Sequence, residues 1–340
     1  MPPQSPYSST VRYAWSSIVE GARNYGNMLI EWSVRQALDL PEPHITFDSF
    51  RPLDDATIVR INAECAFLLS PGCTTLQHGQ NVAYDSFGRV RLPKPTFGGC
   101  LWQAAITSKL AMATRAFTPA GMTRPIRRAG EVDLTIPRLM SPPVGTRDPF
   151  TQDALTAGGV PARFVGCPTL LSPRFVSAWR KPGGDRLVMS LSRASLPTQW
   201  RLIRKLAKRW RVSVLVHEPY ERKVARLIKG VRLVEFASPE QYMGEYRDAD
   251  LVVTGRLHGA LPAVRHGTPV LFYGDPGDTR FSLLSHLGLP IHPLSAALAD
   301  SAEAVRTGGL GGEVFDRAYA LRVAFVEYAG EFGIPTRLDL

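Results

Sequence analysis

Residues 248–274 read DADLVVTGRLHGALPAVRHGTPVLFYG, and this stretch decides the fold class. Two apolar runs, 250–255 and 268–274, flank a helix candidate at 256–267. Strands that are continuously apolar are typical of parallel sheets covered by helices on both faces. The stretch therefore predicts a strand–helix–strand unit of a parallel α/β domain.

The same alternation extends upstream through the second half of the chain. Further strands are expected at 185–193, 212–218 and 231–236. Helices are expected at 197–210, 220–230 and 238–249, with proline or serine at two of the starts and glycine at one end. We therefore predict a Rossmann-like domain over residues 183–311.

The first half is less regular, but it follows a similar order. Expected strands lie at 10–15, 44–47, 63–70, 95–102, 135–141 and 162–168, and expected helices at 25–38 and 147–160. A Pro- and Gly-rich stretch, 172–185, indicates a linker. We predict a second Rossmann-like domain over 1–175, facing the first across a ligand cleft. A helix at 313–330, within the segment 312–340, is expected to fold back over it.

Composition and charge limit the class of protein. The 340 residues are 44% hydrophobic and 21% charged, as in an average globular protein. Neither a membrane-spanning run nor a signal peptide is recognisable, so we expect a cytoplasmic protein. The four cysteines lack zinc-site spacing, and no metal site is expected.

The formal net charge of +10 favours an anionic partner, although an arginine-rich composition explains it equally well. The sequence contains no recognisable nucleic-acid-binding motif, and its basic residues are scattered, so no nucleic-acid partner is expected. Peripheral contact with the anionic inner face of a membrane is compatible with this charge.

Arg256 and His258 follow the predicted strand 250–255, in the first turn of the next helix. Ligands of open parallel sheets bind at the carboxyl ends of the strands. A guanidinium binds carboxylate or phosphate with two hydrogen bonds, and a histidine beside a bound anion can transfer a proton near neutral pH. We predict that these two residues are catalytic. The alternative is that Arg256 bonds a carbonyl and His258 is structural.

Other residues near predicted strand ends and helix starts complete the expected substrate-binding site. In the second half they are Arg193, His217 and Arg280. In the first half they flank the starts of two predicted helices, and they are Asn24, Gly26, Asn27 and Arg147. Helix capping is the alternative role for the two asparagines.

These segments resemble the polysaccharide pyruvyl transferase family over nearly the whole chain, from about Val11 to Leu289. The Asn-x-Gly-Asp loop of that family is similar to residues 24–27, and its Arg-Asp helix segment to 146–166. Its Arg-x-His segment is the most specific match and corresponds to 248–258. Three residues depart from the family pattern: Asn27 and Cys167 stand where aspartates are usual, and Arg280 where lysine is frequent.

The resemblance implies a GT-B-like glycosyltransferase architecture and phosphoenolpyruvate as donor substrate, with no separate cofactor. The product would be a pyruvate ketal on two hydroxyls of a sugar, free or lipid-linked, in a polysaccharide or glycolipid. The first domain would then hold the acceptor and the second the donor, whose carboxylate and phosphate need two cationic contacts. Two alternatives remain: a nucleotide-sugar glycosyltransferase, with Glu218 or Glu235 contacting the ribose, and a non-catalytic anion- or glycan-binding homologue.

Overall fold

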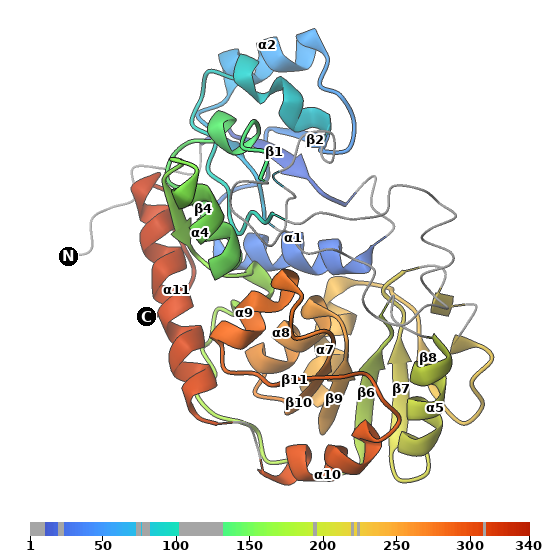
Figure 1. Ribbon diagram of the computed structural model, residues 1–340. Coiled ribbons are helices and arrows are strands. Elements are labelled where there is room, and N and C mark those ends of the chain that lie inside the picture. Colours follow the sequence, from blue (N-terminus) through green and yellow to red (C-terminus); the bar gives the residue numbers. More distant parts are fainter. Residues whose placement is uncertain are drawn as a thin grey trace.

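The computed structural model describes residues 11–19, 24–72, 76, 82–101, 132–192, 196–218, 221–222, 225–308 and 311–340. The second half forms a six-stranded parallel sheet with the order β11-β10-β9-β6-β7-β8 (Figure 1). Its strands are β6 (Arg186–Ser190), β7 (Arg211–Leu215), β8 (Arg232–Val234), β9 (Leu251–Thr254), β10 (Val270–Tyr273) and β11 (Ile291–His292). From β6 the next strands, β7 and β8, are added on one side, and β9, β10 and β11 are then added on the other side, so the strand order reverses between β6 and β9. This topological switch point is where such sheets bind ligands.

Both faces of this sheet are buried, which explains why its strands are continuously apolar. Alternate residues of β6 enter two different cores, Leu187 and Met189 on one side and Val188 on the other. The first core includes residues of α5 (Leu196–Leu206) and α10 (Leu298–Gly308). The second includes residues of α7 (Pro239–Asp248), α8 (Leu257–Arg265) and α9 (Ser282–His286). The expected Rossmann-like sheet of the second half is therefore confirmed.

The first half forms a smaller, irregular parallel arrangement. A three-stranded sheet has the order β2-β1-β3, and a separate pair joins β4 to β5. Parallel bridges from Ser70 to Thr96 and from Gly99 to Thr146 link these two sheets. The strands are β1 (Ala14–Ser17), β2 (Ile45–Asp48), β3 (Leu68–Leu69), β4 (Val144–Thr146) and β5 (Ala162–Phe164), and the helices are α1 (Tyr25–Ala37), α2 (Asp55–Glu64) and α4 (Pro149–Ala157).

Two expected strands of the first half are wrong. Residues 135–141 contain a 3-10 helix at Pro137–Leu139, and the strand lies further along, at β4. Proline has no backbone N–H to donate to a sheet, so Pro137 disfavours a strand there. Of the expected strand 95–102, the described residues 95–101 contribute isolated bridges rather than a regular strand.

The C-terminal helix α11 (Glu313–Glu331) packs on the first half of the chain (Figure 1). Phe325 and Tyr328 share a buried cluster with Trp15 of β1. The Tyr328 hydroxyl accepts hydrogen bonds from the backbone N–H groups of Thr96 and Gly145, both at 3.1 Å. The segment after the second sheet thus returns to the first half, while the domain bounds 1–175, 183–311 and 312–340 stay predictions.

Candidate functional site

Arg256 lies at the topological switch point, between β9 and α8. Its Nε donates to the carbonyl of Leu191, just beyond β6. Its Nη1 donates to Glu218 Oε1 at 3.2 Å, and its Nη2 pairs with Glu221. Since Glu218 and Glu221 follow β7, Arg256 connects the carboxyl ends of three neighbouring strands.

The guanidinium of Arg256 is therefore engaged with carboxylates of its own chain. Glu221 also accepts hydrogen bonds from the backbone N–H groups of His217, at 2.7 Å, and Glu218, at 3.2 Å. Burial raises the pKa of Glu221, and the nearby Arg256 opposes that shift. We expected a guanidinium free to form two hydrogen bonds with a bound anion, and this expectation is corrected. A ligand must share the guanidinium of Arg256 with Glu218 and Glu221.

Replacing Arg256 by lysine should destabilise this edge even though the charge is kept. A lysine ammonium cannot span the Leu191 carbonyl and both carboxylates. We expect the free energy of unfolding, measured by urea denaturation, to fall by about 1–3 kcal/mol. The matched control is Arg211→Lys, which alters an exposed pair with Asp185 and should change stability by less than about 0.5 kcal/mol. Equal effects of the two variants would contradict the structural role of Arg256.

His217 follows β7 and is fully buried. Its Nε2 lies 2.7 Å from the Tyr246 hydroxyl, and its Nδ1 has no hydrogen-bond partner within the described ranges. Burial, and then the nearby Arg256 and His258, hold the pKa of His217 well below its usual value. The ring is therefore neutral near pH 7. The predicted direct contact of His217 with substrate is corrected, because no part of the side chain is exposed.

A second histidine, His266, follows α8, is only partly exposed, and should make the stability of the fold depend on pH. Burial, with a smaller contribution from Arg265, lowers the pKa of His266 to about 4. In both the folded and the unfolded chain this ring is neutral above about pH 6.5, and between about pH 6.5 and pH 4 only the unfolded chain takes up the proton. The stability that depends on the neutral ring is therefore lost as the pH falls from about 6.5 toward 4.

His266→Gln should remove this pH dependence, because glutamine does not titrate. Between pH 7 and pH 5 we expect the wild type to lose about 2 kcal/mol more than the variant, measured by urea denaturation at each pH. Buried carboxyl groups with raised pKa values, such as Asp148, act in the opposite direction. Because both proteins contain them, their effect cancels in the difference. If the free energy of unfolding depends on pH in the same way for both proteins, His266 is not held neutral in the folded chain.

The start of α1 contacts the carboxyl edge of the second-half sheet. The Tyr25 N–H donates to the carbonyl of His217 at 2.9 Å. The Tyr25 ring stacks on Phe236, with 4.5 Å between the ring centroids. A loop from the first half is thereby fixed against the end of β7 in the second.

The two asparagines of this loop have structural partners. Asn24 is the N-cap of α1, and its Oδ1 accepts from the Gly26 N–H at 3.0 Å. Asn27 donates from Nδ2 to the carbonyl of Ile18, beyond β1, at 3.1 Å. The capping alternative is thus observed for Asn24, and ligand contacts of both asparagines stay predictions.

Gly26 and His258 are in close contact across the two halves. A Cβ atom added to Gly26 would lie 2.9 Å from His258 Nδ1 and 3.4 Å from His258 Cβ. Only a glycine allows the ring to lie this close to the first turn of α1. The structure therefore brings together five of the predicted residues at one place: Asn24, Gly26, His217, Arg256 and His258.

The remaining predicted residues lie elsewhere or outside the described ranges. Arg147 is 5% exposed, and its Nε donates to Asp148 at 3.1 Å. Arg280 donates from Nε to both carboxylate oxygens of Asp278 at 2.9 Å. These local pairs replace the open anion contacts that the sequence predicted for both arginines. Arg193 lies outside the described residues.

Sequence reasoning missed one carboxylate at the end of β1. Glu31 is 8% exposed and accepts from Trp15 Nε1 at 3.2 Å, from Ser17 Oγ at 2.8 Å and from the Ile18 N–H. Burial raises the pKa of Glu31, and these hydrogen bonds oppose the shift. In the sequence, Glu31 lies one helical turn after Asn27 and among apolar residues. That position could have indicated a buried carboxylate beside the Asn24–Asn27 loop.

The described part of the chain gives no sign of a metal centre or a membrane span. It contains no cluster of three or more His, Cys, Asp or Glu side chains that could hold a metal ion. No described helix is both long enough and apolar enough to cross a bilayer. Cys65, Cys100 and Cys167 are buried free thiols.

Comparison with known families agrees with the segments that meet at this site. A family model described as polysaccharide pyruvyl transferase matches residues 24–275, which include the Asn24–Asn27 loop and the Arg256–His258 segment. The chain belongs to the polysaccharide pyruvyl transferase family. As a member of this family it is a transferase. A search of curated protein sequences found no match.

Similar solved structures establish the fold of this pyruvyl transferase family member. A putative UDP-N-acetylglucosamine 2-epimerase from Listeria monocytogenes is 12% identical, with a TM-score of 0.52 over 91% of this chain and 90% of that one. A UDP-GlcNAc 2-epimerase from Neisseria meningitidis bound to UDP-GlcNAc is 9% identical, with a TM-score of 0.52 over 93% and 99%. At this identity the likeness concerns the fold alone. It confirms the expected GT-B arrangement of two Rossmann-like halves.

Proposed function

We propose that the protein transfers pyruvate from phosphoenolpyruvate to two hydroxyls of a sugar, forming a cyclic ketal and releasing phosphate. One observation carries the proposal: the family's Arg-x-His segment and its N-terminal loop, far apart in sequence, meet where His258 contacts Gly26. This contact lies at the switch point of the second sheet, where ligands of such folds bind.

The proposed reaction needs one group that moves protons at the carbon–carbon double bond. C3 of phosphoenolpyruvate gains a proton and becomes a methyl group, while a sugar hydroxyl bonds to C2 and loses its proton. A second hydroxyl then displaces phosphate from C2 and releases its own proton, so that a diol and phosphoenolpyruvate become a ketal and phosphate. His258 is the proposed proton carrier, because an imidazole both donates and accepts near neutral pH.

The donor carries a carboxylate and a phosphate, and it requires cations close to His258. We propose that Arg256 contributes one donor contact while keeping Glu218 and Glu221 in place. Arg193, three residues after the end of β6 in the sequence, is the proposed second cation.

The acceptor is proposed to lie on the side of the first half, next to the Asn24–Asn27 loop. Asn27 occupies the position where the family resemblance implies an aspartate. The buried carboxylate of Glu31 is bonded to the N–H of Ile18, the residue whose carbonyl accepts from Asn27. We propose that the sugar belongs to a polysaccharide or glycolipid made at the cytoplasmic side of a membrane.

The nucleotide-sugar alternative receives less support from the strand ends. Its two candidate ribose ligands are both engaged: Glu218 with Arg256, and Glu235 with Arg222 at 2.8 Å and Arg226 at 3.3 Å. A ribose would have to displace these cations from either carboxylate.

Incubation with phosphoenolpyruvate and a panel of glycosides tests the proposal through phosphate release. We expect release only when both donor and a suitable acceptor are present. Consumption of a nucleotide sugar instead would support a glycosyltransferase. A rise in melting temperature with phosphoenolpyruvate, but without turnover on any glycoside, would support a binding protein.

A further inference from the structure

Arg265, the last residue of α8, is a buried cation without a carboxylate partner among the described residues. It is 6% exposed, and its Nη1 donates to Ser33 Oγ of α1 at 3.1 Å. Its guanidinium carbon lies 5.0 Å from the ring centroid of Trp32. Its buried Nε has no hydrogen-bond partner in the described part of the chain. Part of the hydrogen-bonding capacity of this guanidinium is therefore unused.

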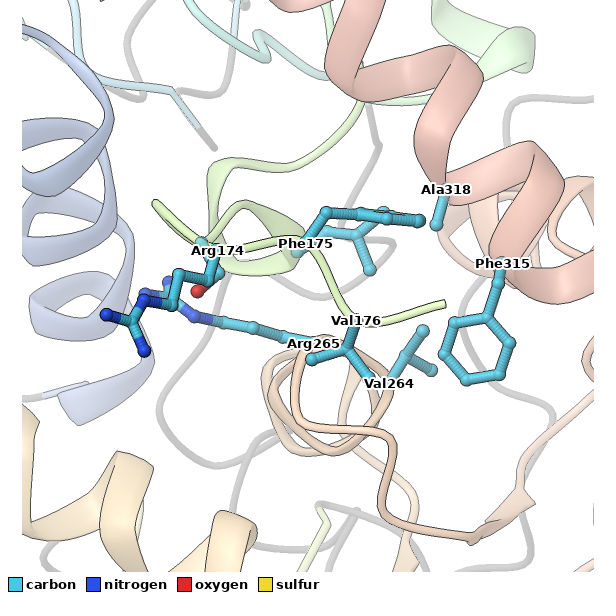
Figure 2. A pocket seen from close by; sticks show the side chains of 9 residues that line it. Arg174, Phe175, Val176, Val264, Arg265, Phe315 and Ala318 are labelled. Carbon is cyan, nitrogen blue, oxygen red and sulfur yellow. The ribbon is translucent and has the colours of Figure 1, made fainter. Parts of the chain in front are cut away.

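Arg265 lines a pocket together with a second arginine, Arg174. The pocket is formed by the segment that leaves the first half, by α8 and by α11, and its lining also includes Ser172, Val264 and Phe315. Figure 2 shows the side chains of Arg174 and Arg265 extending in the same direction, toward α1. Arg174 is exposed, and within the described residues it forms no ion pair. Two arginines thus line one pocket, with their side chains extending side by side (Figure 2).

A third arginine adds positive charge at this place. Arg322 of α11 is 2% exposed and donates to the carbonyls of Ser172, Pro173 and Asp339. Burial, with a contribution from Arg322, lowers the pKa of Arg265 to about 10. A buried cation needs a counter-charge or a full set of hydrogen bonds, and a bound anion would supply both.

We propose that this pocket binds a small phosphate-class oxyanion, either inorganic phosphate or a phosphomonoester. Planar guanidinium groups match phosphate oxygens in a bidentate manner, and Ser172 adds a hydroxyl to the same lining. A phosphate has enough oxygens to accept from two arginines and a hydroxyl at once.

The position of the pocket links it to both halves of the molecule. Arg265 ends the helix whose first turn carries His258, seven residues earlier and so about 10.5 Å away along α8 at 1.5 Å per residue. Ser33 belongs to α1, the helix that begins at the Asn24–Asn27 loop. An anion here would stabilise the packing of α1, α8 and α11. Binding of this anion does not depend on which reaction the enzyme catalyses.

Thermal melting and calorimetric titration of the full chain with inorganic phosphate test the proposal at low ionic strength. We expect phosphate to raise the melting temperature above the value in sodium chloride of equal ionic strength. Arg174→Gln should raise the phosphate dissociation constant by about tenfold or more, as expected for a lost charged hydrogen bond. Because Arg174 is exposed, this variant should fold normally.

Arg201→Gln is the matched control, since Arg201 is an exposed arginine on α5. It should leave the phosphate dissociation constant unchanged within about twofold. Arg265→Lys, which keeps the charge but loses the planar fork, should weaken phosphate binding as Arg174→Gln does. If that variant fails to fold, Arg174→Gln decides alone.

Three results would overturn the proposal. One is a wild-type melting temperature that phosphate raises no more than chloride does. Another is phosphate binding that Arg174→Gln leaves intact, which would place the anion elsewhere, for instance at the switch point. The third is acetate binding as tight as phosphate binding and equally sensitive to Arg174→Gln, which would assign the pocket to carboxylates.

Discussion

His258→Asn is expected to lower the turnover number by about 10²–10⁴-fold while the protein stays folded. The imidazole lies in the first turn of α8, against Gly26 of the opposite half. Asparagine keeps a polar side chain of similar reach, but it cannot carry a proton near neutral pH. The affinity for phosphoenolpyruvate should change little, because the proposed donor contacts are arginines.

Steady-state rates, donor titration and melting temperature together separate a catalytic from a structural His258. The control is His44→Asn, which removes a histidine paired with Glu64 at 2.6 Å on α2. That variant should retain wild-type turnover. A His258→Asn enzyme that melts at lower temperature but turns over within a few-fold of wild type would contradict the catalytic assignment.

Gly26→Ala is expected to lower turnover by about 10²-fold without loss of stability. The added methyl group would lie 2.9 Å from His258 Nδ1 and 3.1 Å from Asn24 Oδ1, so the imidazole must move away. A displacement of about 1 Å in a reacting group can cost about 10²-fold in rate. The helix preference of alanine over glycine, up to about 1 kcal/mol, offsets the cost of moving these side chains, so the melting temperature should change little.

Gly330→Ala is the matched control for this substitution. Gly330 lies in α11, and a Cβ atom there would meet no other group within 4 Å. Its turnover should equal that of the wild type. If Gly26→Ala also retains full turnover, the contact between Gly26 and His258 does not position the reacting group.

Much of the second-half fold could be predicted because its strands are buried on both faces. The predicted segments 185–193 and 250–255 each contain an observed strand, the segment 212–218 overlaps β7 from its second residue on, and continuous apolar runs identify all three. The strands of the first half were harder to predict, because they are short and are linked by isolated bridges. No periodic pattern reveals a bridge of one residue pair.

The partners of the site residues depended on chain topology. Arg256 pairs with Glu218 and Glu221 because β6 lies between β7 and β9, an order that no local pattern specifies. The His217 ring is buried against Tyr242 and Tyr246, because α7 packs beside the end of β7, a placement that no local pattern specifies. The pair between Arg280 and Asp278 is different, since two residues of separation made it predictable.

The central claim is tested most directly by following C2 of phosphoenolpyruvate. With ¹³C at that carbon and a glycoside acceptor, we expect the label to appear in the sugar as a quaternary ketal carbon, one phosphate being released for each ketal formed. The His258→Asn variant should suppress both signals together. Label that remains in phosphoenolpyruvate, or that is released only as free pyruvate while a nucleotide sugar is consumed, would contradict pyruvyl transfer.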